Sequence, residues 1–178
     1  MGLLLFSGLA AAKEAAAPLP VPEPPPGFSA TLTAYNAVPA QTDGDPSVTA
    51  SGGPATPGVV AARSQDLAAE LPFGTVIELM PAATSTACGY GAVASQIGYR
   101  VVTDTMNARY SDRVDILFDT HDPVALADGR TVNASVALGV CAVTVRVVGR
   151  IDLAQAPLPQ TQEELAARIG KGELALGR

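Results

Sequence analysis

The sequence predicts a mainly β domain, a small closed barrel of about six strands with one or two short helices and a C-terminal helix. Apolar, β-branched segments of strand length recur along the chain, separated by clusters of Gly, Pro, Asp and Ser, which are typical turn residues. The helical segments between them are too few and too short to cover both faces of a parallel sheet. A closed barrel hides its strand edges without such cover, so we expect closure.

The first half of the domain is expected to hold three strands. The segment 28–36 alternates and is rich in Thr, Phe and Tyr. A long loop of turn formers, "QTDGDPSVTASGGPATPG", separates it from a short buried strand at 59–64. A helix is expected to start at Ser64 or Asp66. The turn "PFG" then opens a strand over 72–80.

The second half of the domain is expected to hold three further strands. Residues 81–97 are rich in Gly and Ala and poorly patterned, which predicts an insertion loop. Strands follow at 98–106 and 113–119. The segment 121–129 is expected to form a helical turn or two. Within 136–150 the chain ends as a long strand in which Val and Arg alternate.

Segments of different composition flank this domain, which we place at residues 28–150. Residues 1–17 resemble the back half of a secretory signal: the apolar run Leu3–Leu9 precedes small residues suited to cleavage, although no basic segment stands before it. Residues 18–27 form a proline-rich linker. The apolar run is too short to span a bilayer, so we expect an exported periplasmic or extracellular protein without an integral membrane span.

The tail, residues 151–178, contains one further element. The motif "TQEELAARI" predicts a helix capped by Thr161, with Glu164 three residues on as in a capping box. Beyond Gly170 no ordered element is expected.

Composition excludes several classes of function. The net charge of −6 and the lack of a basic stripe disfavour nucleic-acid binding, and the absence of Trp removes a large stacking platform. His121 is the only histidine, and Cys88 and Cys141 stand far apart, so no Cys/His metal site and no cofactor is expected. In an oxidising compartment the two cysteines could form a disulfide; two buried free thiols are the alternative.

Two acids stand where the apolar pattern predicts core. Asp104 ends one strand, and Asp115 lies in the middle of "VDILF", on the opposite side from Val114, Ile116 and Phe118. A buried carboxylate is costly unless it lies at a cleft or accepts hydrogen bonds. Two neighbouring carboxylates raise one pKa and yield a general acid, which glycosidic cleavage requires. The alternative is that both acids cap loop amides or pair with Arg63, Arg109 or Arg113.

A second acidic cluster is a weaker candidate. Asp119 and Asp122 flank His121, and a His–Asp pair can perform acid–base chemistry. Ser111 or Ser135 would then have to complete a triad, but no G-x-S-x-G elbow supports one. A surface histidine beside a turn is the preferred interpretation.

The order of motifs "LTAYN", "TASG", "VAARSQDLAAELPFGTVIEL", "YRVVTDTMNARYSDRVDILFDT" and "ALGVCAVTVRVVG" resembles the three-aspartate (3D) domain over about residues 28–150. This family of double-psi β-barrels occurs in bacterial cell-wall proteins and includes membrane-bound lytic transglycosylase A and Gram-positive muralytic factors. The resemblance is strongest in "V-x-D-T" and "V-D-I-x-F", whose aspartates lie eleven residues apart as in the family. It implies a six-stranded double-psi barrel acting on peptidoglycan glycan strands.

The resemblance also implies roles for individual residues. Asp115 matches the single general acid/base that cleaves the bond between N-acetylmuramic acid and N-acetylglucosamine and closes the 1,6-anhydro product. Asp104 matches a second aspartate that orients the site and tunes Asp115, and Thr105 follows it in the family's position. Thr33 and Tyr35 match positions near the cleft that contact sugar. Asp66 is the displaced counterpart of the first family aspartate.

The chain departs from the family between the two acids. The family continues "D-T-G-x-x-I-K-G", whereas this chain has "DTMNARYSDR", without a glycine after Thr105. Glycine lets the backbone approach a substrate closely. The retained acid pair favours a lytic transglycosylase-like enzyme, and the missing glycines favour a non-catalytic wall-binding or assembly module on the same barrel.

Overall fold

The computed structural model describes residues 26–42, 44–83 and 88–175. The signal-like segment 1–17 and most of the linker 18–27 lie outside the described residues, so the expectations for them stay predictions. No helix of the described ranges has both the length and the apolar character that crossing a membrane requires.

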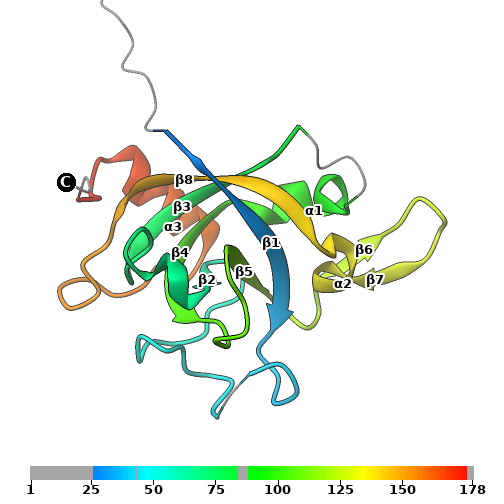
Figure 1. Ribbon diagram of the computed structural model, residues 1–178, viewed down its shortest axis with the longest axis horizontal. Helices are drawn as coiled ribbons and strands as arrows, with labels where there is room; N and C mark the ends of the chain where they lie inside the picture. Colours follow the sequence, from blue (N-terminus) through cyan, green and yellow to red (C-terminus); the bar gives the residue numbers. More distant parts are fainter. Residues whose placement is uncertain (1–25, 43, 84–87, 176–178) are drawn as a thin grey trace, which may run out of the picture.

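Six strands close into a mixed barrel in the order β1–β5–β2–β4–β3–β8, with β8 pairing back onto β1 (Figure 1). The pairs β1–β5 and β2–β4 are parallel, and the other neighbours are antiparallel. The predicted mainly β fold with a closed six-stranded barrel is therefore confirmed. The barrel strands are β1 (Phe28–Asn36), β2 (Val60–Arg63), β3 (Thr75–Pro81), β4 (Tyr99–Thr105), β5 (Arg113–Phe118) and β8 (Cys141–Arg150).

Side-chain alternation along these strands builds two apolar layers. One layer draws residues such as Leu32, Ile116 and Val143 from every barrel strand and fills the interior. The other lies on the opposite face of the strands, where Val76 and its neighbours pack against Leu165 and other residues of the C-terminal segment. The tail thus buries an apolar face that the barrel would otherwise expose.

Two short helices lie side by side at one end of the barrel (Figure 1): α1 (Tyr90–Ile97) and α2 (Ala134–Leu138). The prediction that residues 81–97 form an insertion loop is wrong for residues 90–97, which form α1. Its small residues give little periodicity, and only Val93 and Ile97, one turn apart, are buried. Tertiary contact with α2, which the local sequence does not reveal, stabilises this helix.

A disulfide joins these two helical segments. Cys88 precedes α1, Cys141 begins β8 directly after α2, and their Cα atoms lie 5.4 Å apart. The backbone N–H of Gly89 also donates to the carbonyl of Leu138 at 3.1 Å. Of the two alternatives that the sequence left open for the cysteines, the structure therefore has the disulfide.

The segment after β5 differs from its prediction. The helical turn expected at 121–129 is instead a small hairpin of β6 (Pro123–Ala125) and β7 (Thr131–Asn133). Its strands have three residues each, too few for an alternation pattern to appear in the sequence. Near Ser64, where a helix start was predicted, a single 3-10 turn, η1 (Gln65–Ala68), forms.

The tail folds back onto the barrel. The predicted C-terminal helix is α3 (Gln162–Gly170), and the Thr161 hydroxyl caps it by accepting from the N–H of Glu164 at 3.2 Å. Beyond Gly170 the described residues contain no further helix or strand, as expected, but one isolated bridge ties them to the barrel. Ala175 exchanges two backbone hydrogen bonds with Arg150, at 2.9 and 3.0 Å, and so extends the edge of β8.

Candidate active site

A β-bulge in β4 determines which way Asp104 points. In the pairing of β2 with β4, Ala61 faces Val102, but the next residue, Ala62, faces Asp104. Thr103 is therefore an extra residue on β4. Because side chains alternate along a strand, this extra residue turns Asp104 to the face that Ala62 occupies.

The second acid reaches the same face from the other side of β2. Asp115 of β5 also pairs with Ala62, and Thr33 of β1 pairs with Asp115. A row across four neighbouring strands thus reads Thr33, Asp115, Ala62, Asp104. Strands are spaced by about 4.8 Å, so the two acidic positions lie roughly 10 Å apart with only a methyl side chain between them.

This row forms the floor of a groove of about 1190 Å³. Five of the six predicted site residues line it: Thr33, Tyr35, Asp104, Thr105 and Asp115. The walls come from the loop between β1 and β2 and from the segment between β4 and β5. The sequence identified the first of these segments as a loop of turn formers but gave no sign that it forms a wall of the site. The two acids therefore face one open groove.

Asp115 has the properties of a general acid. Its carboxyl is partly buried at the groove floor and, among the described residues, accepts one hydrogen bond, from the Thr33 hydroxyl to Oδ1 at 2.8 Å. Burial raises the pKa of Asp115 to about 6, against the lowering effects of the Thr33 hydrogen bond and the Arg113 charge; the charge of Asp104 raises it further. Near neutral pH this carboxyl can both release and take up a proton.

Asp104 is held by hydrogen bonds. Its Oδ1 accepts from the backbone N–H groups of Ala50 and Thr105, both at 2.9 Å, and its Oδ2 accepts from the hydroxyl of Tyr35 at 3.0 Å. These three donors hold the carboxyl group in one orientation. Asp104 therefore fixes the Ala50 loop against the groove and supplies a negative charge near Asp115.

Tyr35 connects β1 with β4 across the groove. It is 9% exposed, lies on β1 two residues after Thr33, and reaches Asp104 on β4. Burial, followed by the charge and hydrogen bond of Asp104, raises the pKa of Tyr35 well above its ordinary range. The phenol thus stays protonated and remains a hydrogen-bond donor.

The structure does not bring Asp66 to the groove. Its carboxylate accepts from the backbone N–H of Asp112 at 2.8 Å, and a hydrogen bond from Ser64 is the main cause that lowers its pKa. Asp112 has a φ of 51°, an uncommon conformation for a residue with a side chain. Asp66 therefore holds the turn that leads into β5.

The structure contradicts the alternative that the two acids pair with arginines. Arg63 donates through Nε to the carbonyl of Leu71 at 3.0 Å, and among the described residues neither Asp104 nor Asp115 has an arginine within ion-pair distance. The other part of that alternative, capping of loop amides, does describe Asp104 but not Asp115.

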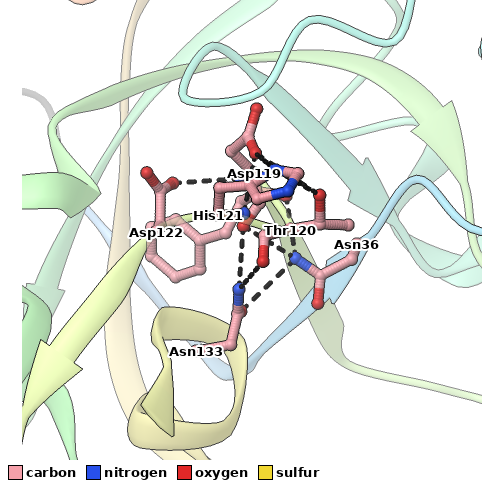
Figure 2. A network of polar contacts seen from close by, with 7 residues as sticks. Asn36, Asp119, Thr120, His121, Asp122 and Asn133 are labelled. Atoms are coloured by element: carbon pink, nitrogen blue, oxygen red, sulfur yellow. Dashed lines mark hydrogen bonds and ion pairs between the residues drawn. The ribbon is translucent and has the colours of Figure 1, made fainter. Parts of the chain in front are cut away.

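The acidic cluster around His121 forms no catalytic arrangement (Figure 2). The His121 side chain is 93% exposed and contacts Asp119 through Nδ1 at 3.2 Å. The hydroxyl of Ser135 donates to the side chains of Asn36 and Asn133, at 2.7 and 2.8 Å. Asn36 and Asn133 in turn donate to the carbonyl of Asp119 and hold the loop after β5. The network is structural.

Comparisons with known proteins provide no further assignment. A scan against protein-family models, a search of curated proteins and a search of solved structures each found no match to this chain. The described residues contain no group of three or more His, Cys, Asp or Glu side chains arranged to hold a metal ion. Function is therefore inferred from the groove itself.

Proposed function

We propose that the chain is a lytic transglycosylase-like enzyme that cleaves the β-1,4 bond between N-acetylmuramic acid and N-acetylglucosamine in peptidoglycan. The observation that carries the proposal is a partly buried carboxyl with a pKa raised to about 6, Asp115, at the floor of an open groove. A single such acid is what this reaction needs, because the substrate itself supplies the nucleophile.

The proposed reaction uses Asp115 twice. Protonated Asp115 donates its proton to the glycosidic oxygen as the bond from that oxygen to muramic C1 breaks. The carboxylate then accepts the proton of the muramic O6 hydroxyl, whose oxygen forms a bond to C1 and closes the 1,6-anhydro ring. No water is consumed, and Asp115 ends in its starting protonation state.

The neighbours of Asp115 support this double role. The Thr33 hydroxyl orients the carboxyl, and the fixed charge of Asp104 favours the protonated form of Asp115 between turnovers. Asp104 and Tyr35 also hold one wall of the groove through Ala50. They act here as positioning residues.

The fold is compatible with the same proposal. A closed six-stranded mixed barrel is compatible with the double-psi arrangement that the resemblance to 3D domains implies. The proposed location is the periplasm or the cell exterior. A disulfide between Cys88 and Cys141 supports that location, because disulfides persist mainly in oxidising compartments.

A non-catalytic wall-binding module is the second candidate. The segment after Thr105 favours it: in place of glycines, Met106, Asn107 and Ala108 line the groove, and Met106 is only 8% exposed. Side chains here keep a glycan further from the backbone than glycines would. Such a module would bind glycan strands without making product.

Digestion of purified peptidoglycan separates the two candidates. The wild-type protein is expected to release 1,6-anhydro-muropeptides, detected by mass spectrometry, and Asp115→Asn is expected to release none. Asp128→Asn is the matched control, since Asp128 pairs with Arg130 in an exposed turn outside the groove. Binding without product in the wild type would instead support the module, and unchanged activity in Asp115→Asn would remove Asp115 from the mechanism.

A further inference from the structure

Two arginines stack on one tyrosine at the edge of the groove. The guanidinium carbon of Arg109 lies 4.8 Å from the centroid of the Tyr110 ring, and that of Arg113 lies 4.7 Å from it. Arg109 also donates to the Tyr110 hydroxyl at 2.8 Å. All three residues line the groove. The ring thus holds two positive charges close together.

Neither guanidinium has an acidic partner among the described residues. The ion pairs of that part of the chain involve other cations. The Nε of Arg113 is buried without a hydrogen-bond partner, although the residue as a whole remains partly accessible. A buried guanidinium N–H without an acceptor is costly, and no acceptor among the described residues offsets that cost.

The position of Arg113 ties this pair to the acid of the site. Arg113 lies two residues before Asp115 on β5, so both side chains project to the same face, with their Cα atoms about 7 Å apart. An anion held by the pair would therefore sit next to the bond that Asp115 is proposed to cleave.

We propose that Arg109, Tyr110 and Arg113 form a carboxylate-binding subsite of the groove. Planar guanidinium groups match carboxylates geometrically, through paired N–H donors. Resting on the proposed function, the ligand class is the acidic arm on the muramic unit next to the cleaved bond: the lactyl group with the carboxylates of its stem peptide. The subsite would select muramic over unsubstituted glucosamine units.

The charges elsewhere in the groove also favour binding of a carboxylate at the arginine pair. The acidic side chains that line it are Asp45, Asp104 and Asp115. Asp45 accepts from the N–H and hydroxyl of Ser47, and Asp104 accepts from three donors. These acids repel a carboxylate, so a bound anionic arm is directed to the arginine pair.

A soluble probe tests the subsite apart from glycan. N-acetyl-L-alanyl-D-glutamate, a dianion, is titrated into the full chain while NMR follows the arginine Nε–Hε signals; its diamide is the neutral comparison. The dianion is expected to shift the signals of Arg109 and Arg113, and the diamide is not. Arg109→Gln and Arg113→Gln are each expected to weaken binding about fivefold, as for an exposed ion pair. Equal binding of the diamide would overturn the subsite.

Controls protect the result from a folding artefact. Arg130→Gln, on the exposed turn, is expected to bind the dianion as the wild type does. Arg113→Lys keeps the charge but loses the planar fork, and should retain part of the affinity. If Arg113→Gln unfolds, the exposed Arg109→Gln still decides: undiminished binding by that variant contradicts the proposal.

Whole peptidoglycan separates this inference from the proposed function. Binding and cleavage are compared on native sacculi and on sacculi whose carboxylates have been converted to amides with carbodiimide and ammonia. The subsite predicts that amidation weakens binding and that the arginine variants lose this difference. Cleavage that ignores amidation would overturn the subsite and leave the proposed function standing. Binding of the soluble dianion without any binding or cleavage of sacculi would leave the subsite standing and overturn the proposed function.

Discussion

Asp104 and Asp115 face the same backbone position, Ala62 of β2, from the two strands on either side of it. They reach it by different routes. Asp115 comes from a regular antiparallel register, whereas Asp104 comes from a parallel register shifted by the bulge at Thr103. On β2 only the methyl group of Ala62 stands between the two acidic positions, and all three residues line the groove that a glycosidic oxygen would have to enter.

The first prediction is that enlarging Ala62 blocks the site. Ala62→Val adds two methyl groups between the acids, and Val suits a strand, so the fold should be kept at a cost of about 1–3 kcal/mol of unfolding free energy. Release of 1,6-anhydro product is expected to fall at least about tenfold, because a displacement of roughly 1 Å at the reacting centre costs that much or more. Ala125→Val on exposed β6 is the control. Undiminished release by folded Ala62→Val would show that substrate does not enter between the acids.

The second prediction concerns the pH dependence of activity. Asp115 must be protonated to start the reaction and has a pKa of about 6, so kcat/KM should fall about tenfold per pH unit above pH 6. Thr33 donates a hydrogen bond that lowers this pKa, so Thr33→Val should move the falling limb to higher pH. Thr31→Val, on the same face of β1 and outside the groove lining, should leave it in place. A profile that is flat from pH 5 to 8 would contradict the assignment.

The strands and the two central acids were predictable from the sequence because both signals are local. β1 and β5 alternate or carry continuous apolar runs, and an acid such as Asp115 inside an apolar strand stands out against that pattern. Thr33 and Tyr35, in contrast, were placed near the cleft only through the resemblance. Their contacts with Asp115 and Asp104 join residues 82 and 69 positions apart in the chain.

The features that the sequence did not predict depend on tertiary contacts. The bulge at Thr103 leaves no local pattern, since "VVTDT" is as consistent with a regular strand. α1 is stabilised by α2 and the disulfide rather than by its own periodicity. The stacking of Arg109 and Arg113 on Tyr110 requires the chain to turn between β4 and β5, and the sequence suggested these arginines only as partners of the acids.

The third prediction is that the Tyr35 hydroxyl stabilises the fold through Asp104. Tyr35→Phe removes the only side-chain donor to Oδ2 of Asp104 among the described residues and should lower the unfolding free energy by about 1–2 kcal/mol. Urea denaturation at pH 7 measures the change. Tyr99→Phe is the matched control, because the Tyr99 hydroxyl has no hydrogen bond within the described part of the chain. Equal decreases in unfolding free energy in the two variants would mean that the hydrogen bond to Asp104 does not stabilise the fold.

The fourth prediction concerns the disulfide. Cys88 and Cys141 are 53 residues apart, and closing a loop of that length in the unfolded chain stabilises the folded state by up to about 4 kcal/mol. Replacing both with Ala should lower the unfolding free energy by an amount of this order. The disulfide lies away from the residues that line the groove, so product release below the unfolding temperature should persist. Two free thiols in exported protein, seen by non-reducing mass spectrometry, would contradict the disulfide itself.

The fifth prediction is that the proposed catalytic acid weakens the fold at neutral pH. Burial raises the pKa of Asp115 from 3.8 in the unfolded chain to about 6, so the stability from its protonated form is complete below pH 3.8 and is lost as the pH rises through 6. Asp115→Asn is neutral at every pH and can still accept from Thr33. It should therefore be more stable than the wild type at pH 7, by on the order of 2 kcal/mol, with the gap closing toward pH 4.

Asp119→Asn is the control with the opposite sign, because hydrogen bonds from His121 lower the pKa of Asp119, and it should gain no stability at pH 7. Chemical denaturation from pH 4 to 8 measures both variants. A constant gap between Asp115→Asn and the wild type over that range would mean that Asp115 titrates normally and lacks the raised pKa that the proposed mechanism requires.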